Sequence, residues 1–170
     1  MTEKERLETI RKAVRQYQEP LTRYAAGMLR DIHRARDAVQ ETFLRLCSAD
    51  LKTITPYIEP WLFRVCRSRV FDVLRKETPM ETREMRESGR SDDPSAAAEA
   101  RETESRIAQA IRKLPSDQQD VIRLKFQQGL KYKEISRITD KTVGNVGFLI
   151  HTALKKIRSG IDSELQGGAQ

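Results

Sequence analysis

The sequence predicts an all-α fold, with two small helical domains joined by a flexible acidic linker and a helix-turn-helix in the C-terminal domain. Three observations lead to this prediction. Apolar residues recur every three or four positions through most of the 170 residues, with no strand-like alternation and no internal repeat. A stretch in the middle has almost no large apolar residues. That stretch is acidic, whereas the segments on both sides of it are basic.

The net charge of +7 is unevenly distributed along the chain. Residues 1–79 hold 16 Lys and Arg against 11 Asp and Glu, residues 80–105 hold 4 against 8, and residues 106–160 hold 12 against 4. Because Lys and Arg that neutralise phosphates release condensed counterions, two basic blocks favour a polyanionic partner. Basic helix faces that are only solvated would give the same charges. A sequence motif is therefore needed to distinguish a polyanion-binding surface from a solvated one.

The N-terminal segment begins with a helix. Thr2 and Glu5 have the spacing of a capping box, and apolar residues at helical spacing follow them. Pro20 is expected to interrupt this pattern before the same apolar face continues. A second helix is expected over residues 35–48.

The rest of the first domain contains a connection and a long helix. Residues 50–60 form the expected connection, with Pro56 and Pro60 as helix breakers, and Pro60 then opens the long helix. The expected buried stripe of that helix consists of Trp61, Leu62, Val65, Cys66, Val70, Val73 and Leu74.

A linker is expected after this helix. Residues 81–102 contain Met85 as their only large apolar residue, so they bury too little surface to offset the entropy of ordering. Asp93 and Pro94 look like an N-cap and the first residue of the next helix. The expected boundaries are a first domain over residues 1–79, a linker over 80–100, a second domain over 101–165 and a tail over 166–170.

The second domain is predicted to contain four helices. The first ends at Pro115, and Ser116 with Gln119 forms a second capping box ahead of a helix that Gly129 ends. A short helix follows over residues 132–138, and a tight turn leads to a longer helix over residues 142–161.

The last two helices have the spacing of a helix-turn-helix. Ile135 and Ile138 are expected to face inward on the short helix. An ordinary pair of antiparallel helices uses the same spacing, but the basic charge of this segment favours DNA. The inward stripe of the longer helix is expected to be Val146, Ile150, Leu154 and Ile157.

The segment from Leu114 to Arg158 resembles region four of bacterial sigma factors of the extracytoplasmic-function (ECF) group. That family has Leu-Pro, a helix, Gly-Leu-x-Tyr-x-Glu-Ile-Ala, a Thr-Val pair and a basic recognition helix. The matching residues are Leu114, Pro115, Gly129, Leu130, Tyr132, Glu134, Ile135, Val146, His151, Ala153, Ile157 and Arg158.

The N-terminal half resembles region two of the same family. The segment DAVQETFLRL, residues 37–46, is similar to its Asp-x-Val-Gln-Glu-x-Phe-Leu-Arg-Leu signature. The segment PWLFRVCRSRVFDVLRK, residues 60–76, is similar to its Trp-Leu helix. The two signatures occur in the family's order and cover most of the chain.

The resemblance implies a sigma factor that directs core RNA polymerase to promoter DNA. It implies that the second domain meets the β flap of the polymerase, and that an anti-sigma factor is a further partner. The residues that it places against the clamp of the β′ subunit are Asp37, Gln40 and Glu41. Because these positions are three and four residues apart, a solvated helix face is the simpler alternative.

The resemblance also assigns the long helix of the first domain to the −10 promoter element. Cations suit phosphates there, and an aromatic ring suits the bases of a melted strand. The implied contacts are Arg64, Arg67, Ser68, Phe71, Arg75 and Lys76; the family commonly has Asn where this chain has Ser68. A loop over residues 48–57 is expected to hold a base flipped out of the stack.

The recognition helix is assigned to the −35 element, and here the chain departs from its family. Gly147, Leu149 and Thr152 stand where Arg or Lys is usual, and Gly144 and Gly147 each cost about 1 kcal/mol of helix propensity, which a close approach would compensate. Either the −35 sequence is unusual, or Phe148 and Leu149 meet a protein. The implied DNA contacts are Lys141, Thr142, Asn145, Phe148, His151 and Lys155.

Other classes of protein fit the sequence less well. A helix-turn-helix regulator independent of core polymerase is the alternative, but residues 1–79 show no sensing or receiver pattern. An enzyme would need clustered carboxylates or metal ligands, and neither an enzyme nor a cofactor is expected. Cys47 and Cys66 are expected to be small buried side chains, with a zinc site involving His33 or His151 as the alternative. No membrane span or secretory signal is found, so a cytoplasmic location is expected.

Overall fold

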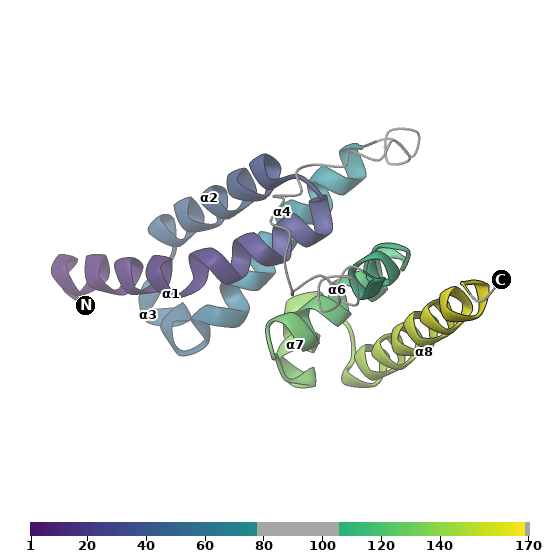
Figure 1. Ribbon diagram of the computed structural model, residues 1–170. Helices are drawn as coiled ribbons and strands as arrows, with labels where there is room; N and C mark the ends of the chain where they lie inside the picture. The colour runs from purple at the N-terminus through teal and green to yellow at the C-terminus, as the bar shows by residue number, and fades with distance from the viewer. Residues whose placement is uncertain (78–105, 169–170) are drawn as a thin grey trace, which may run out of the picture. The chain divides into compact units, whose positions relative to one another are not determined.

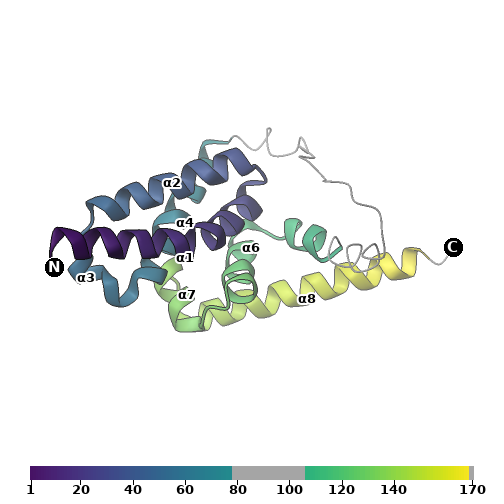
Figure 2. The same cartoon turned by 60° about the vertical axis from the view of Figure 1, so that its left-hand side comes forward.

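The computed structural model describes residues 1–77 and 106–168, and no strand occurs among them (Figures 1 and 2). The all-α prediction is confirmed. The chain divides into two compact units: the helices of residues 1–77 together with residues 133–140 form the first, and the rest of residues 106–168 form the second. The expected linker and the helix start at Asp93 and Pro94 lie outside the described residues, and the expected domain boundaries stay a prediction.

Helix α1 (Glu3–Leu29) begins at the predicted capping box. The Glu5 amide donates to the Thr2 hydroxyl at 3.2 Å, and the Thr2 amide donates to the Glu5 carboxylate at 2.6 Å. The bond from the Thr2 amide stabilises the charged carboxylate and lowers the pKa of the Glu5 carboxyl. The predicted interruption at Pro20 is wrong, because Pro20 lies inside α1. A proline inside a helix costs about 3 kcal/mol, and burial of the apolar face that continues after it, including Leu21 and Tyr24, offsets that cost.

Helix α2 (Ile32–Ser48) starts three residues earlier than expected. Asp31 is its N-cap and accepts hydrogen bonds from the amides of His33 and Arg34 at 2.9 and 3.2 Å. These two bonds satisfy orphan donors of the first turn and lower the pKa of the Asp31 carboxyl. Along the helix, Ala35, Ala38, Val39, Thr42 and Leu46 are buried.

The expected connection over residues 50–60 is wrong, because it is largely helical. Asp50 caps the short helix α3 (Leu51–Ile54), and the 3₁₀ turn η1 (Thr55–Tyr57) follows with Pro56 near its start. Helix α4 (Ile58–Lys76) then begins two residues before Pro60. A proline in the first turn of a helix removes no intrahelical bond, so it breaks nothing here.

The core of the first unit lies between α1, α2 and α4, which pack against one another (Figures 1 and 2). The rings of Tyr24 and Phe63 meet edge to face, with centroids 6.0 Å apart. Phe63 is fully buried although the predicted stripe omitted it. That stripe was partly wrong: Leu62, Cys66 and Val70 are buried, whereas four of its members are half-buried, namely Trp61, Val65, Val73 and Leu74.

The second unit contains a π-helical segment that the sequence did not predict. Helix α6 (Ser116–Ile122) continues into this segment, η2 (Arg123–Gln127), and Gly129 ends it at a φ of 68° as expected. The predicted capping box of Ser116 and Gln119 is wrong, because Pro115 occupies the N-cap position. The Gln119 amide group instead donates to the carbonyls of Arg112 and Leu114 at 3.1 and 2.8 Å, which satisfies the end of the preceding helix.

Two further helices follow along the chain, the first of them grouped mostly with the first unit and the second with the second unit. Helix α7 (Tyr132–Thr139) has Ile135 and Ile138 buried, as predicted. Asp140, at a φ of 58°, follows α7, and the Thr142 hydroxyl caps α8 (Val143–Gly167) by accepting from the Asn145 amide at 3.0 Å. Helix α8 packs against α6 and runs six residues beyond the expected end.

Candidate polymerase and nucleic-acid interfaces

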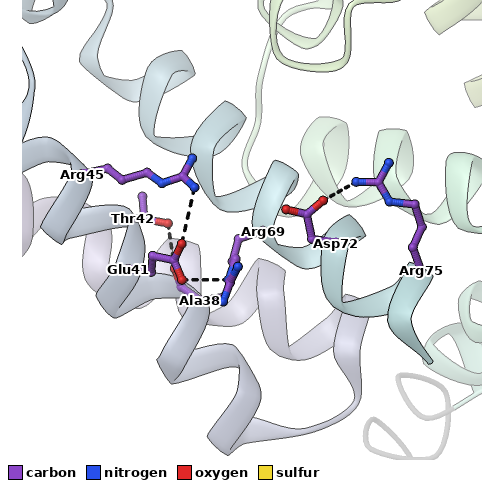
Figure 3. A network of polar contacts seen from close by, with 7 residues as sticks. All are labelled: Ala38, Glu41, Thr42, Arg45, Arg69, Asp72 and Arg75. Atoms are coloured by element: carbon purple, nitrogen blue, oxygen red, sulfur yellow. Dashed lines mark hydrogen bonds and ion pairs between the residues drawn. The ribbon is translucent and has the colours of Figure 1, made fainter.

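The outer side of α2 carries the three residues expected to meet the polymerase. Asp37 and Gln40 are exposed, and Glu41 is half-buried on the same side of the helix. Glu41 accepts ion pairs from Arg45 on α2 at 3.4 Å and from Arg69 on α4 at 2.8 Å (Figure 3). The structure therefore brings all three residues to one polar face.

This face continues along α2 toward its C-terminal end. Leu44 is exposed, and it lines a shallow hollow together with Glu41, Arg45, Ser48 and Ala49. The other side of the helix faces the core, where Leu46 is fully buried and Phe43 is half-buried. The helix thus separates a packing side from a side that a partner can reach.

Helix α4 presents a row of cations. Arg64, Arg75 and Lys76 are exposed, and so is the hydroxyl-bearing Ser68. The Arg67 guanidinium lies 4.4 Å from the centroid of the Phe71 ring, one helical turn away, so it forms a cation–π contact. Arg75 forms an ion pair with Asp72 (Figure 3). Cations and an aromatic ring on one helix are the components that hold a single strand of DNA.

The segment expected to form a base-holding loop is mostly helical. Residues 48–57 are not a loop, because α3 and η1 occupy most of them. Leu51 and Ile54 are buried and fix the segment to the unit, while Thr53 and Tyr57 are exposed. The binding of a flipped base by these residues stays a prediction.

The start of α8 carries the residues expected at the −35 element. Asn145, Phe148, His151 and Lys155 are exposed at intervals of three or four residues, so they share one side of the helix. Phe148 is 66% exposed, so its ring is open to a partner. Lys141 is half-buried before the helix, and the Thr142 hydroxyl is already used as the N-cap.

The close approach expected at Gly144 and Gly147 is not observed. A Cβ atom at Gly144 would meet open space, so no close approach explains that glycine. A Cβ atom at Gly147 would lie 3.5 Å from the Tyr132 ring, an ordinary van der Waals distance. A close approach that compensates both glycines is therefore not found among the described residues.

The inward stripe of α8 differs from the prediction at one position. Val146 and Ile150 are buried and Ile157 is half-buried, as expected for a packing stripe. Leu154 is 39% exposed, and Ala153 is buried in its place. The observed stripe therefore steps by four, three and four residues, which stays closer to one side of a helix than the predicted steps of four, four and three.

The two cysteines lie in different surroundings. Cys66 is buried, and burial raises the pKa of its thiol to about 12, so it stays protonated. The expectation that Cys47 is also buried is wrong, because it is exposed near the end of α2. Within residues 1–77 and 106–168 no group of three His, Cys, Asp or Glu side chains is placed to hold a metal ion. In the same ranges, no helix is long and apolar enough to cross a membrane.

Sequence reasoning missed Arg69 as a residue that contacts the polar face of α2. Its guanidinium on α4 contacts Glu41 on α2, although the two residues are 28 positions apart in the sequence. The i, i+4 partner Arg45 could be found from spacing, but Arg69 could not, since the packing of α4 on α2 alone brings it to Glu41.

Comparison with known proteins gives matches in both halves of the chain. Residues 13–79 match the family model described as Sigma-70 region 2, and residues 104–157 match the one described as Sigma-70, region 4. The chain is 25% identical over 153 residues to the ECF RNA polymerase sigma factor SigM of Bacillus subtilis, covering 89% of this chain and 94% of that protein. It is 28% identical over 155 residues to SigW of the same organism, covering 84% and 83%.

Two solved structures have a similar fold. CnrH, solved in complex with the cytosolic domain of CnrY, superposes with a TM-score of 0.65 at 22% identity, covering 91% of this chain and 88% of that one. The sigma factor RpoE of Bartonella quintana, solved with the anti-sigma factor NepR, gives a TM-score of 0.64 at 14% identity, covering 89% and 96%. With a region 2 match, a region 4 match and relatives aligned along most of its length, this chain belongs to the sigma-70 family and is an RNA polymerase sigma factor of the ECF group.

Proposed function

We propose that this chain docks on core RNA polymerase through the polar face of α2, and that it brings α4 to the −10 element and α8 to the −35 element of a promoter. The observation that carries the proposal is the placement of Asp37, Gln40 and Glu41 on one accessible side of a helix whose other side is core. A carboxylate pair on such a face suits a basic partner surface, which here is the clamp of the β′ subunit.

The promoter contacts follow from what each helix exposes. On α4 the cations Arg64, Arg67, Arg75 and Lys76 neutralise phosphates of the melted −10 strand, and Phe71 with Ser68 meets its bases. On α8 the Asn145 amide is suited to adenine, and Phe148 to thymine methyl groups. Lys141, Thr142, His151 and Lys155 complete this second interface.

The proposal includes two further protein partners and a location. The second domain, over residues 101–165, meets the β flap of the polymerase and keeps the spacing between the two promoter elements. An anti-sigma factor restrains the free protein; this partner is supported by the two similar structures, since RpoE was solved with an anti-sigma factor and CnrH with the cytosolic domain of CnrY. The chain acts in the cytoplasm, where core polymerase and promoters are present.

Reversing the charge of the polymerase face tests the docking proposal. The double variant Asp37→Lys and Glu41→Lys is expected to abolish binding to purified core polymerase while the helical circular dichroism signal is kept. The matched control is Glu8→Lys with Glu19→Lys, which makes the same charge change on exposed positions of α1. Loss of helicity along with binding in the first variant would show that these residues are structural, and equal loss of binding in the control would show that the face has no specific role.

A further inference from the structure

The carboxylate of Glu41 joins the two helices that the proposed function uses. Its Oε2 atom accepts from Arg69 Nε of α4 at 2.8 Å, and its Oε1 atom accepts from Arg45 Nη2 of α2 at 3.4 Å (Figure 3). Figure 3 shows dashed lines from the Glu41 carboxylate to both guanidinium groups. One partner thus comes from the same helix and the other from the helix packed against it.

The two contacts differ in how firmly they can hold the carboxylate. The Arg45 side chain is 53% exposed and its contact is long, so solvent and rotamer freedom compete with it. The Arg69 side chain is 37% exposed, and its contact is short and depends on the packing of α4 against α2. Arg69 is therefore the residue that fixes where the Glu41 carboxylate lies.

The Glu41 carboxylate remains able to receive a further partner. A carboxylate has about four lone-pair sites, and the two arginines occupy one on each oxygen. The Glu41 side chain keeps 32% of its surface exposed. A donor from another protein can reach the remaining sites without displacing Arg69.

We propose that Arg69 is a positioning residue for polymerase docking, and that it acts by holding the Glu41 carboxylate in the orientation that the clamp receives. This inference rests on the proposed function of the α2 face. A side chain that is ordered before association loses less entropy when the complex forms, so a preset carboxylate binds more tightly than a mobile one. Arg69 thereby links the helix that meets DNA to the face that meets the polymerase.

A double-mutant cycle on the full chain tests this inference. Binding to purified core polymerase, without DNA, is measured for Arg69→Met, Glu41→Ala and the double variant. Arg69→Met is expected to weaken binding about two- to five-fold, the range of a partly exposed ion pair, and to have no further effect once Glu41 is absent. If the methionine variant loses helicity, Arg69→Lys gives the same comparison with the charge kept, and a smaller loss is expected.

A control variant separates this effect from a general loss of charge. Arg23→Met removes a more exposed ion pair within one helix, with Glu19 on α1, and is expected to bind core polymerase as the unmodified chain does. If Arg69→Met weakens binding equally with and without Glu41, or not at all, the positioning role is overturned while docking through α2 stands. If Glu41→Ala leaves binding unchanged, Glu41 takes no part in docking and the positioning role fails, whereas docking through α2 is decided by the double charge reversal of Asp37 and Glu41.

Discussion

The two helices assigned to DNA, α4 and α8, differ in the chemistry that they expose. Helix α4, 19 residues long, carries four cations apart from the Glu41-paired Arg69, namely Arg64, Arg67, Arg75 and Lys76. Residues 143–154, the first three turns of α8, contain no Lys or Arg and expose Asn145 and Phe148 instead. The first helix is thus equipped to hold the sugar-phosphate backbone, and the second to contact base edges.

This difference determines where promoter affinity and promoter selectivity arise. Contacts to phosphates supply most of the affinity and its dependence on salt, whereas contacts to base edges supply preference for a sequence. Because the cations of α8 begin only at Lys155, the −35 interface is expected to add selectivity with little affinity. We expect the first unit to carry more of the binding free energy than the second.

Removing two cations from α4 should have the largest effect on promoter affinity. We expect Arg67→Ala with Arg75→Ala to lower the slope of log affinity against log salt by about one to two units, since each phosphate contact contributes about 0.7 to 0.9. Filter binding of the holoenzyme to a promoter fragment at several salt concentrations measures this slope. The matched change on α8, Lys155→Ala with Lys156→Ala, should lower it less; an equal or larger drop would reverse the comparison.

Replacing Asn145 should affect selectivity rather than general affinity. If its amide pairs with adenine in a bidentate manner, Asn145→Ala should relax preference at one −35 position by about 1–3 kcal/mol and leave the salt slope unchanged. The Asn145 side chain is not needed for the cap of α8, because the Thr142 hydroxyl accepts from the Asn145 backbone amide. Selection from randomised −35 sequences measures the preference, and an unchanged preference with no −35 footprint would assign this face to a protein partner.

Adding a cation to the start of α8 should make its contribution to promoter affinity more like that of α4. Gly147→Arg restores the residue type that is usual at this position in the family, and the Cβ atom fits at van der Waals distance from Tyr132. We expect a salt slope steeper by about one unit and tighter binding to all promoter fragments. Gly144→Arg is the control, because it adds the same charge at a glycine in open space one turn earlier. If both variants gain affinity equally, the added charge acts through the general field and not through a contact at position 147.

The smallest expected effect concerns stability and leaves DNA binding unchanged. Gly160 lies inside α8 with open space around its Cβ position, so Gly160→Ala should raise the free energy of unfolding by about 0.5–1 kcal/mol. Gly129→Ala should lower it, since Gly129 has a φ of 68°. Urea unfolding measures both, and a stability change of the same sign in both variants would contradict this account of the two glycines.

Features set by neighbours in the sequence could be predicted, and features set by packing could not. The capping box of Thr2 and Glu5, the left-handed Gly129 and the inward side of α7 all depend on residues within a few positions. The prediction at Pro20 is wrong because the burial of the apolar face that follows it outweighs its local cost. Phe63 was missed because its contact with Tyr24 joins two distant segments.

In the candidate sites, too, local spacing could be predicted from the sequence and contacts between helices could not. The i, i+3, i+4 spacing placed Asp37, Gln40 and Glu41 on one face, and the structure keeps them there. The link from Glu41 to Arg69 required the packing of α4 on α2. The π-helical turn at η2 has no signal in the sequence pattern, since helices of either kind bury the same apolar residues.

One measurement tests most directly whether this chain selects promoters as part of RNA polymerase. Purified core polymerase is given a library of promoter fragments with and without the chain, and the run-off transcripts are sequenced. We expect discrete start sites only when the chain is present, preceded by shared −10 and −35 sequences, and no comparable selection of the same fragments by the chain alone. Selective DNA binding without core polymerase, together with no new transcripts, would contradict the account and favour a regulator that acts independently of the polymerase.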